Sequence, residues 1–172
     1  MSHPILNLDQ VELEPRPAES AAPGAAGERF DARMGEIASR IGARLLGCNL
    51  TAIPPGKAAF PRHNHHVNEE LFVILDGAGE LHIGDARHPL RAGDVVACPP
   101  GGSETAHQIR NTGTRELRFL AISTRLLPEI VGYPDSGKFG VRNEWVDPAS
   151  GETCLFRYFG RSGDSLCYWD GE

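Results

Sequence analysis

The sequence lacks a long apolar run, an excess of positive charge and any pair of closely spaced cysteines. No stretch approaches the roughly 20 apolar residues that a helix needs to cross a bilayer, so we expect no membrane partner. The 17 Lys and Arg stand against 23 Asp and Glu, which gives a net charge of −6. This balance argues against a nucleic-acid-binding protein, because no basic field is available to neutralise phosphates.

None of the four cysteines belongs to a C-x-x-C pair, which argues against a zinc ribbon or a thioredoxin-type site. The N-terminus is acidic and has no basic start before an apolar stretch, so we expect no secretory signal. Together these features predict a cytoplasmic protein with four free thiols. A disulfide between Cys154 and Cys167 is the alternative, although such bonds are rare in a reducing compartment.

Glycine and proline are abundant, with 20 and 13 residues, which favours many short elements joined by turns, as in all-β proteins. A length of 172 residues suits one domain whose core needs no disulfide or metal staple. Between Leu45 and Thr124, apolar runs end at Gly, Pro, Asn or Asp about every eight to twelve residues. This pattern predicts a β-sandwich or a β-barrel.

The N-terminal part differs from the rest of the chain. Residues 1–14 form a loosely apolar arm, and the Pro-, Ala- and Gly-rich segment 15–28 is a linker or a long surface excursion. We therefore divide the chain into an arm and linker, 1–28, and a barrel with C-terminal strands, 29–172. Within the barrel, the apolar spacing of 30–46 fits either a helix or short strands broken at its glycines.

The last twenty residues hold five of the twelve aromatic side chains of the chain. A disordered tail would be poor in such residues, so we expect an ordered one. We predict two short strands, near 153–159 and 165–169, joined by a turn at Gly160–Gly163. They would bury one aromatic row on the barrel or on a partner subunit, as a plain terminal hairpin or as a wall of a pocket.

Three histidines and one glutamate form the candidate site. His63 and His65 are two residues apart, so on a strand they point to the same face. Glu70 lies five residues beyond His65, a spacing that on one straight strand would put it on the opposite face. The polar HVNE stretch between them can make a turn, which would let Glu70 face the same side as the two histidines. The turn at Pro99–Gly102 delivers His107 at the start of a new strand.

Three imidazoles and one carboxylate, without a thiolate, suit one divalent transition metal ion per chain: iron, manganese, nickel, cobalt, copper or zinc. Such a donor set leaves positions open for substrate, water or dioxygen. His66 in place of His65 is the alternative ligand, and Glu69 should face away if Glu70 faces inward. We expect His82 and His88 to lie on the surface.

Other side chains are candidates for a substrate contact. Lys57 has the parity of His63 and could reach an anionic substrate, while Phe72 and Ile74 share a face with Glu70 and would line the barrel. The alternatives are a solvated lysine and plain core packing. The segment GYPDSGKFG, 132–140, is a turn by composition or a cover of the barrel mouth.

These segments resemble the paired motifs of the cupin superfamily. The first motif, G-x5-H-x-H-x3,4-E-x6-G, matches from His63 to Gly77, with six residues rather than five between Gly56 and His63. The second motif, G-x5-P-x-G-x2-H-x3-N, matches except that five residues rather than two separate its second glycine from its histidine; its members here are Gly93, Pro99, Gly101, His107 and Asn111.

The resemblance covers about residues 45–125. It implies a single-domain jelly-roll β-barrel, also called a double-stranded β-helix, with a metal ion inside held by His63, His65, Glu70 and His107. The wider pattern is similar to a subgroup of single-domain bacterial cupins, some of them provisionally labelled sugar phosphate isomerases. Resemblance to other cupins also implies a homodimer built on sheet edges or faces, or on exchanged arms.

We therefore expect a metal-dependent enzyme that acts on a small polar organic molecule such as a sugar phosphate. An isomerase or lyase would use the metal to polarise a carbonyl, with Glu70 or a hydroxide on the metal as the base. An iron-dependent dioxygenase and a non-catalytic binding or sensing barrel are the alternatives. Two or more ionisable side chains beside the metal would favour an enzyme, whereas an apolar lining would favour a binder.

Overall fold

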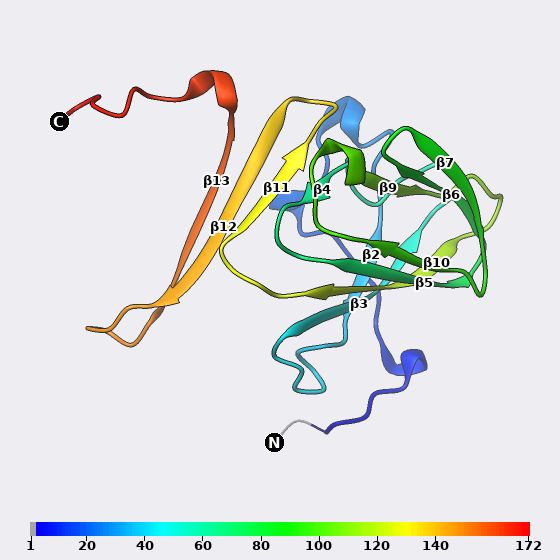
Figure 1. Cartoon of the computed structure of the whole chain (residues 1–172). Helices are drawn as coiled ribbons and strands as arrows, with labels where there is room; N and C mark the ends of the chain where they lie inside the picture. Colours follow the sequence, from blue (N-terminus) through cyan, green and yellow to red (C-terminus); the bar gives the residue numbers. More distant parts are fainter. Residues whose placement is uncertain (1–2) are drawn as a thin grey trace.

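A computed structural model describes residues 3–172, which form thirteen strands and five short 3-10 helices (Figure 1). Neighbouring strands run antiparallel in three sheets. In spatial order, the six-stranded sheet contains β1 (Glu14–Pro15), β2 (Arg33–Glu36), β3 (Leu46–Ile53), β10 (Leu117–Thr124), β5 (Glu70–Asp76) and β8 (Val95–Cys98). The three-stranded sheet contains β7 (Ala86–Arg91), β6 (Ala78–Ile83) and β9 (His107–Arg110).

The third sheet has four strands, β13 (Thr153–Arg161), β12 (Lys138–Val146), β11 (Glu129–Tyr133) and β4 (Asn64–His65). The 3-10 helices are η1 (Leu8–Gln10), η2 (Ala18–Ser20), η3 (Gly24–Ala26), η4 (Ser103–Thr105) and η5 (Ser162–Asp164). This architecture confirms the predicted all-β jelly-roll barrel of the cupin type. No helix in the described range has the length and apolar character needed to span a membrane.

The main core lies inside the barrel, between the six-stranded and three-stranded sheets. Apolar side chains of β5 and β10 pack against those of β6, β7 and β9, because alternate residues of each strand face inward. Burial of each large apolar side chain stabilises the fold by about 1.5–3 kcal/mol. The members from these strands are Phe72, Ile74, Leu81, Leu90, Ile109, Leu117 and Phe119.

The N-terminal arm packs on the outside of the six-stranded sheet of its own chain. Val11 is buried with Ile37 and Leu50, and partly buried leucines of the arm join this second cluster. Segment 30–46 supplies β2 and the start of β3 rather than a helix, so the strand alternative is the one observed. Glycine is needed at position 35 of β2, because a Cβ on Gly35 would collide with the Val11 side chain.

The linker contains η2 and η3 and is fastened to the barrel at two points. The amino group of Lys57 donates to the carbonyls of Gly27 and Glu28, at 3.0 and 2.7 Å. The guanidinium of Arg16 donates to the carbonyl of Ala59 at 2.6 Å. The linker is therefore a fixed wall of the molecule, and the boundary proposed at residue 28 separates segments that are bonded to each other.

The predicted C-terminal hairpin is wrong in its second half. β13 pairs with β12 over nine positions, from Lys138↔Arg161 to Val146↔Thr153, and 165–169 form no strand. The hairpin turn lies instead at 147–152, where the Asp147 carboxylate accepts from two backbone N–H groups. β12 offers β13 nine paired positions, whereas a strand at 165–169 could offer at most five.

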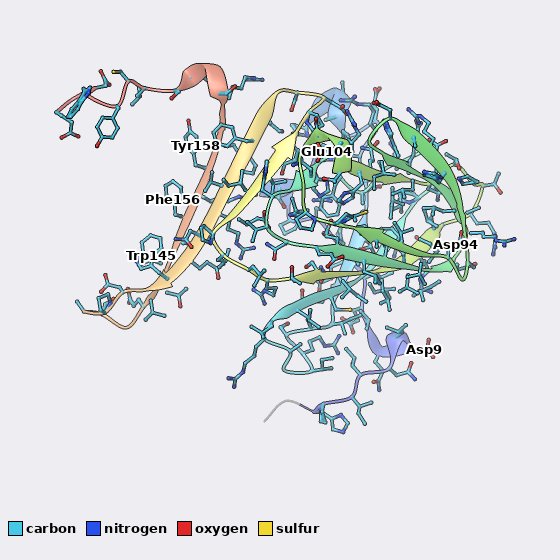
Figure 2. All side chains as sticks on the ribbon, viewed as in Figure 1. Asp9, Asp94, Glu104, Trp145, Phe156 and Tyr158 are labelled. Carbon is cyan, nitrogen blue, oxygen red and sulfur yellow. The ribbon has the colours of Figure 1, made fainter. Side chains whose placement is uncertain are left out.

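The aromatic row that we expected to be buried is exposed in the single chain. Trp145, Phe156 and Tyr158 share one face of the β12–β13 ribbon, which projects from the barrel, and each is about half exposed (Figure 2). Tyr168 and Trp169 beyond η5 are 85% and 72% exposed. All four cysteines are free thiols, so the disulfide alternative is not formed.

Candidate metal centre

The four predicted ligands come together where strands begin or end at one mouth of the barrel. His65 lies on β4, and Glu70 and His107 are the first residues of β5 and β9. His63 precedes β4 and is tied to His107 by two backbone hydrogen bonds of 3.1 and 2.8 Å. Residues far apart in the sequence are therefore held together by main-chain pairing rather than by the side chains themselves.

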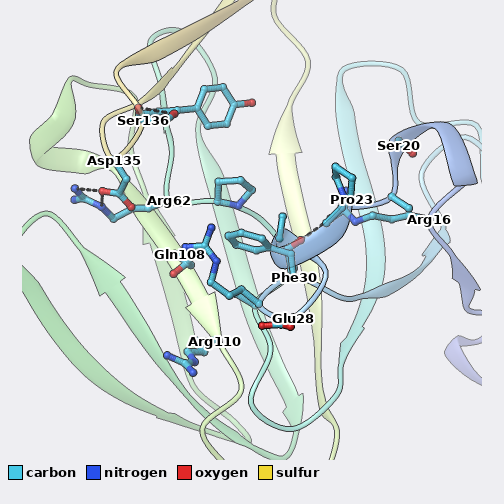
Figure 3. Close-up of a pocket in the computed structure, with 18 of the residues that line it drawn as sticks. Arg16, Ser20, Pro23, Glu28, Phe30, Arg62, Gln108, Arg110, Asp135 and Ser136 are labelled. Carbon is cyan, nitrogen blue, oxygen red and sulfur yellow. Dashed lines mark hydrogen bonds and ion pairs between the residues drawn. The ribbon is translucent and has the colours of Figure 1, made fainter.

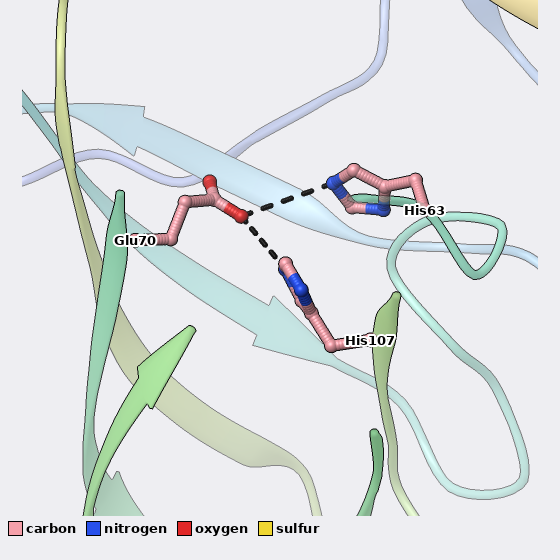
Figure 4. A group of neighbouring side chains, drawn as sticks. All are labelled: His63, Glu70 and His107. Atoms are coloured by element: carbon pink, nitrogen blue, oxygen red, sulfur yellow. Dashed lines mark hydrogen bonds and ion pairs between the residues drawn. The ribbon is translucent and has the colours of Figure 1, made fainter. Parts of the chain in front are cut away.

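The three imidazoles converge on one carboxylate oxygen. Glu70 Oε2 lies 2.9 Å from His107 Nε2, 3.4 Å from His65 Nε2 and 3.8 Å from His63 Nε2. Figure 4 shows this oxygen between His63 and His107, whose ligand atoms and that of Glu70 all lie within 4.8 Å of one another. His65 approaches the same oxygen but lies outside this tightest group.

Hydrogen bonds on the far side of two rings set their tautomers. Nδ1 of His63 lies 2.9 Å from the Pro61 carbonyl, and Nδ1 of His107 lies 3.2 Å from the Thr105 carbonyl. Since a carbonyl oxygen only accepts, each Nδ1 carries hydrogen, and the Nε2 of the neutral ring presents a lone pair. Two lone pairs then face the Glu70 oxygen, an arrangement that a cation between them satisfies.

The third imidazole is backed by a carboxylate that the sequence analysis did not identify. Nδ1 of His65 lies 3.5 Å from Oε2 of Glu129, the first residue of β11. Glu129 is itself buried and accepts from the backbone N–H groups of Val67 and Asn68 and from the Asn68 side chain. Neither ring nitrogen of His65 makes a geometrically good hydrogen bond, so a buried imidazole is left with both nitrogens unsatisfied.

The electrostatics favour a neutral His63 beside an ionised Glu70. Burial lowers the pKa of His63 to about 4 and outweighs the opposing attraction of Glu70. Burial alone would raise the pKa of Glu70, but the His107 and His65 imidazoles that face it hold it well below its ordinary value. Burial also disfavours charge on His65, yet Glu70 and Glu129 outweigh it and raise the pKa of that imidazole.

This donor set fits a divalent transition metal ion. Neutral imidazole nitrogen and carboxylate oxygen are the ligands that such ions take in proteins, and no thiolate is near enough to compete among the described residues. The unsatisfied Nε2 of His65 and the lone pairs of His63 and His107 point to the same partner. The residues present therefore fit the metal that the barrel family implies.

A cavity of about 260 Å³ opens onto this cluster. Tyr133 forms part of its wall, with its ring stacked on that of His63 at a centroid distance of 6.1 Å and an angle of 28°. Burial raises the pKa of the Tyr133 hydroxyl, which keeps it protonated. Most of the remaining lining is apolar, with Met34, Phe60, Phe72, Ile109, Phe119 and Val131 among its members.

The candidate substrate residues divide between cavity, core and linker. Phe72 lines the cavity, whereas Ile74 is 1% exposed and belongs to the core. Lys57 does not line the metal cavity, and its amino group is engaged by carbonyls of the linker. His66 and Glu69 are exposed, so Glu70 and His65 are the members of each pair that face the cluster.

The departures from the second motif also have a structural role. The longer turn before His107 contains η4, whose Thr105 carbonyl is the acceptor for His107 Nδ1. Asn111 is fully buried and donates to the carbonyls of Ile53 and Arg115. This last residue of the motif therefore stabilises a turn and makes no hydrogen bond with the proposed metal ligands. Cys98 is 1% exposed, and burial raises the pKa of its thiol to about 12.

Comparison with known proteins agrees with this geometry. Residues 49–123 match the Cupin domain family. A sugar phosphate isomerase of the cupin superfamily from Silicibacter pomeroyi has 25% identity and a TM-score of 0.76, over 97% of this chain and 98% of that one. A protein from Acidithiobacillus ferrooxidans, provisionally described as a sugar phosphate isomerase, has 28% identity and a TM-score of 0.69, over 88% and 90% of the two chains.

Among curated proteins, an oxalate-binding protein from Thermotoga maritima is 39% identical over 70 residues, or 41% of this chain and 54% of that protein. The chain spans about half the length of the curated relatives it matches. The matched segment contains all four clustered side chains, and the barrel around them has the same fold as the solved relatives. Residues 49–123 of the chain form a cupin domain.

Proposed function

We propose that His63, His65, Glu70 and His107 hold one divalent transition metal ion, and that the protein is a metal-dependent enzyme of the isomerase or lyase type. The observation that carries this proposal is the convergence of three Nε2 atoms on one Glu70 oxygen at the edge of a cavity. The cavity volume of about 260 Å³ suits a small organic molecule.

The chemistry would divide between the ion and the chain. A bound divalent ion would act as a Lewis acid that polarises a carbonyl of the substrate. Glu70 is ionised and would take a proton from the carbon next to that carbonyl and return it to the carbonyl carbon, while the hydroxyl proton of the first carbon passes to the former carbonyl oxygen. The neutral Tyr133 hydroxyl would donate a hydrogen bond, and the apolar lining would keep water away.

The names of the relatives support a sugar phosphate as the substrate class. Two solved relatives that align over most of their length are described as sugar phosphate isomerases. An interconversion of this kind moves a proton between adjacent carbons and needs one base and one electrophile, which is what the cluster offers. The substrate class is part of our proposal and not a property of the fold.

A non-catalytic binding protein is the second candidate. Apart from the four proposed ligands, Tyr133 is the single ionisable side chain that lines the metal cavity within residues 3–172, and most other lining is apolar. The relative from Thermotoga maritima is named an oxalate-binding protein, which supports a small oxyanion as the ligand of such a binder. This candidate predicts tight ligand binding with no turnover.

Deuterium exchange separates the two candidates. The protein would be stripped with a chelator, reloaded with one metal at a time and incubated in D2O with a panel of aldose and ketose phosphates. We expect metal-dependent incorporation of deuterium into one sugar phosphate, reduced at least ~100-fold in Glu70→Gln, which removes both a proposed ligand and the proposed base. The surface variant His88→Ala should behave as wild type. Ligand binding without exchange would favour the binding candidate.

We also propose a homodimer. β13 is an edge strand of nine residues, and the adjoining face of the ribbon exposes Trp145, Phe156 and Tyr158. An exposed apolar strip beside an unpaired strand edge is uncommon in a monomer, and an edge strand can pair with its own copy about a two-fold axis. A second copy of this chain is therefore the partner that we assign to this surface.

A further inference from the structure

A second, larger cavity lies beside the metal cavity. Its volume is about 660 Å³, and it lies between the linker, the barrel mouth and the turn from β11 to β12 (Figure 3). The two cavities share three lining residues, Ala59, Gln108 and Tyr133. A molecule bound in the larger cavity could therefore extend past these residues toward the histidines.

The lining of this cavity is strongly cationic, although the chain as a whole carries a net charge of −6. Glu28 and Asp135 are its two acidic residues. Asp135 is taken up by an ion pair, with its Oδ1 3.0 and 2.7 Å from two guanidinium nitrogens of Arg62. Five basic residues line the same space, namely Arg16, Arg29, Arg62, Arg110 and Lys138.

Four of these cations have no carboxylate partner within 4.0 Å in the part of the chain that the structure describes. The guanidinium of Arg16 instead lies 4.2 Å from the centroid of Phe60, and Lys138 Nζ lies 4.8 Å from that of Tyr133. Arg110 donates to the carbonyl of Gly56 at 3.4 Å. Such contacts position a cation without neutralising it.

The wall that carries these cations is fixed before any ligand arrives. Main-chain hydrogen bonds join Arg29 and Asp31 to Ala58, and Ala58 in turn pairs with Arg110. Lys57 fastens the end of η3 to the barrel through two carbonyls. Main-chain pairing thus places Arg29 and Arg110 on neighbouring segments, and a multiply charged anion bound between like charges reduces their repulsion.

We propose that this cavity binds the phosphate group of a small phosphorylated substrate, with Arg16, Arg29, Arg110 and Lys138 as its cationic contacts. Guanidinium groups match the geometry of phosphate oxygens and bind them through paired, charge-assisted hydrogen bonds. The other end of the substrate would pass Gln108 and Tyr133 to reach the metal cluster. That last step rests on the proposed function, whereas phosphate binding does not.

Calorimetric titration of chelator-treated protein in a low-salt, phosphate-free buffer tests the proposal. The probes are inorganic phosphate, ribose 5-phosphate and, as the uncharged match, ribose. We expect both phosphates to bind and ribose to bind at least ~10-fold more weakly, since charge-assisted hydrogen bonds are the strong ones. Ribose binding as tightly as ribose 5-phosphate would overturn the assignment.

Four variants complete the experiment. Arg16→Ala and Arg110→Ala should each weaken phosphate binding roughly tenfold or more. Arg110 is exposed and makes one long hydrogen bond, so its variant tests the cavity even if Arg16→Ala unfolds. Arg91→Ala, an 88% exposed arginine outside the cavity, should bind as wild type. Equal binding by Arg110→Ala and Arg91→Ala, or no binding by wild type, would refute the proposal.

The fourth variant, His107→Ala, separates this inference from the proposed function. It should bind inorganic phosphate as wild type does while losing the metal, because His107 lines only the metal cavity. Loss of phosphate binding in this variant, with an unchanged melting temperature, would contradict a phosphate site formed by the arginines. Phosphate binding without metal-dependent deuterium exchange would instead refute the isomerase proposal and support the phosphate site.

Discussion

The Glu129 carboxylate lies 3.5 Å from Nδ1 of His65, across the imidazole from the Glu70 oxygen that faces Nε2. Its position is fixed by bonds to the backbone of Val67 and Asn68, in the turn between the two halves of the first motif. One buried carboxylate on β11 thus faces a proposed ligand and holds the turn that brings Glu70 into place. A carboxylate behind a histidine raises the basicity of a metal ligand and fixes its ring.

Glu129→Gln should therefore weaken metal binding about 10- to 100-fold, as does removal of a partner behind a metal-bound histidine. The exposed neighbour Glu69 provides the matched control, because Glu69→Gln changes the same charge outside the cluster. Competition with a metal-sensitive chelator measures both affinities, and the melting temperature of each metal-free variant reports folding. Identical affinities in the two variants would show that Glu129 does not act through His65.

The stability of the metal-free protein should depend on His63 in mildly acidic solution. Its folded pKa of about 4 lies below the unfolded value of 6.5, so the unfolded state binds more protons between these values. The free energy of unfolding then falls as the pH is lowered, with this residue contributing about 2 kcal/mol between pH 7 and pH 5. Urea titrations at the two pH values should show a smaller loss in His63→Gln, and an equal loss would contradict the prediction.

The cysteines should differ sharply in reactivity. Cys167 is exposed, whereas Cys98 is 1% exposed and burial raises the pKa of its thiol to about 12. Alkylation at pH 8, followed by mass spectrometry, should modify Cys167 within minutes and Cys98 only after unfolding, because the thiolate is the reactive form. Rapid modification of Cys98 in the native protein would show that this part of β8 opens.

Assembly should depend on the aromatic strip of the ribbon. Replacement of both Phe156 and Tyr158 by Ser should convert a dimer into a monomer in light scattering, since the two side chains share the exposed face. Tyr168 and Trp169 are even more exposed but lie beyond η5, so their double Ser variant is the matched control. A monomeric wild type, or a dimer that survives the first double variant, would contradict this assignment.

Patterns that are local in the sequence predicted most of the barrel and the cluster. His63 and His65 follow the two-residue period of a strand, and the turns that bring in Glu70 and His107 are marked by their own residues. Glu129 has no such mark, because its partner His65 lies 64 positions earlier and meets it only through the pairing of β11 with β4. A long-range contact of this kind depends on tertiary packing.

The cationic cavity could not be predicted from the sequence for the same reason. Arg16 and Arg29 come from a segment that composition marks as a linker, and Arg110 and Lys138 from strands more than 70 positions away. Lys57 has the right parity to point at a substrate, yet its amino group meets the linker carbonyls before it can reach the cavity. Strand parity gives the side on which a residue lies and not what covers that side.

Metal content tests the central claim most directly. The protein would be purified without a histidine tag, reloaded with excess divalent metal and desalted. Its metal content per chain would then be measured by elemental mass spectrometry. We predict about one transition metal ion per chain in wild type and in the surface variant His88→Ala. His63→Ala, His65→Ala and His107→Ala should each retain at least ~10-fold less, because each removes one of four ligands. Equal metal content in all five proteins would contradict a metal centre at this cluster.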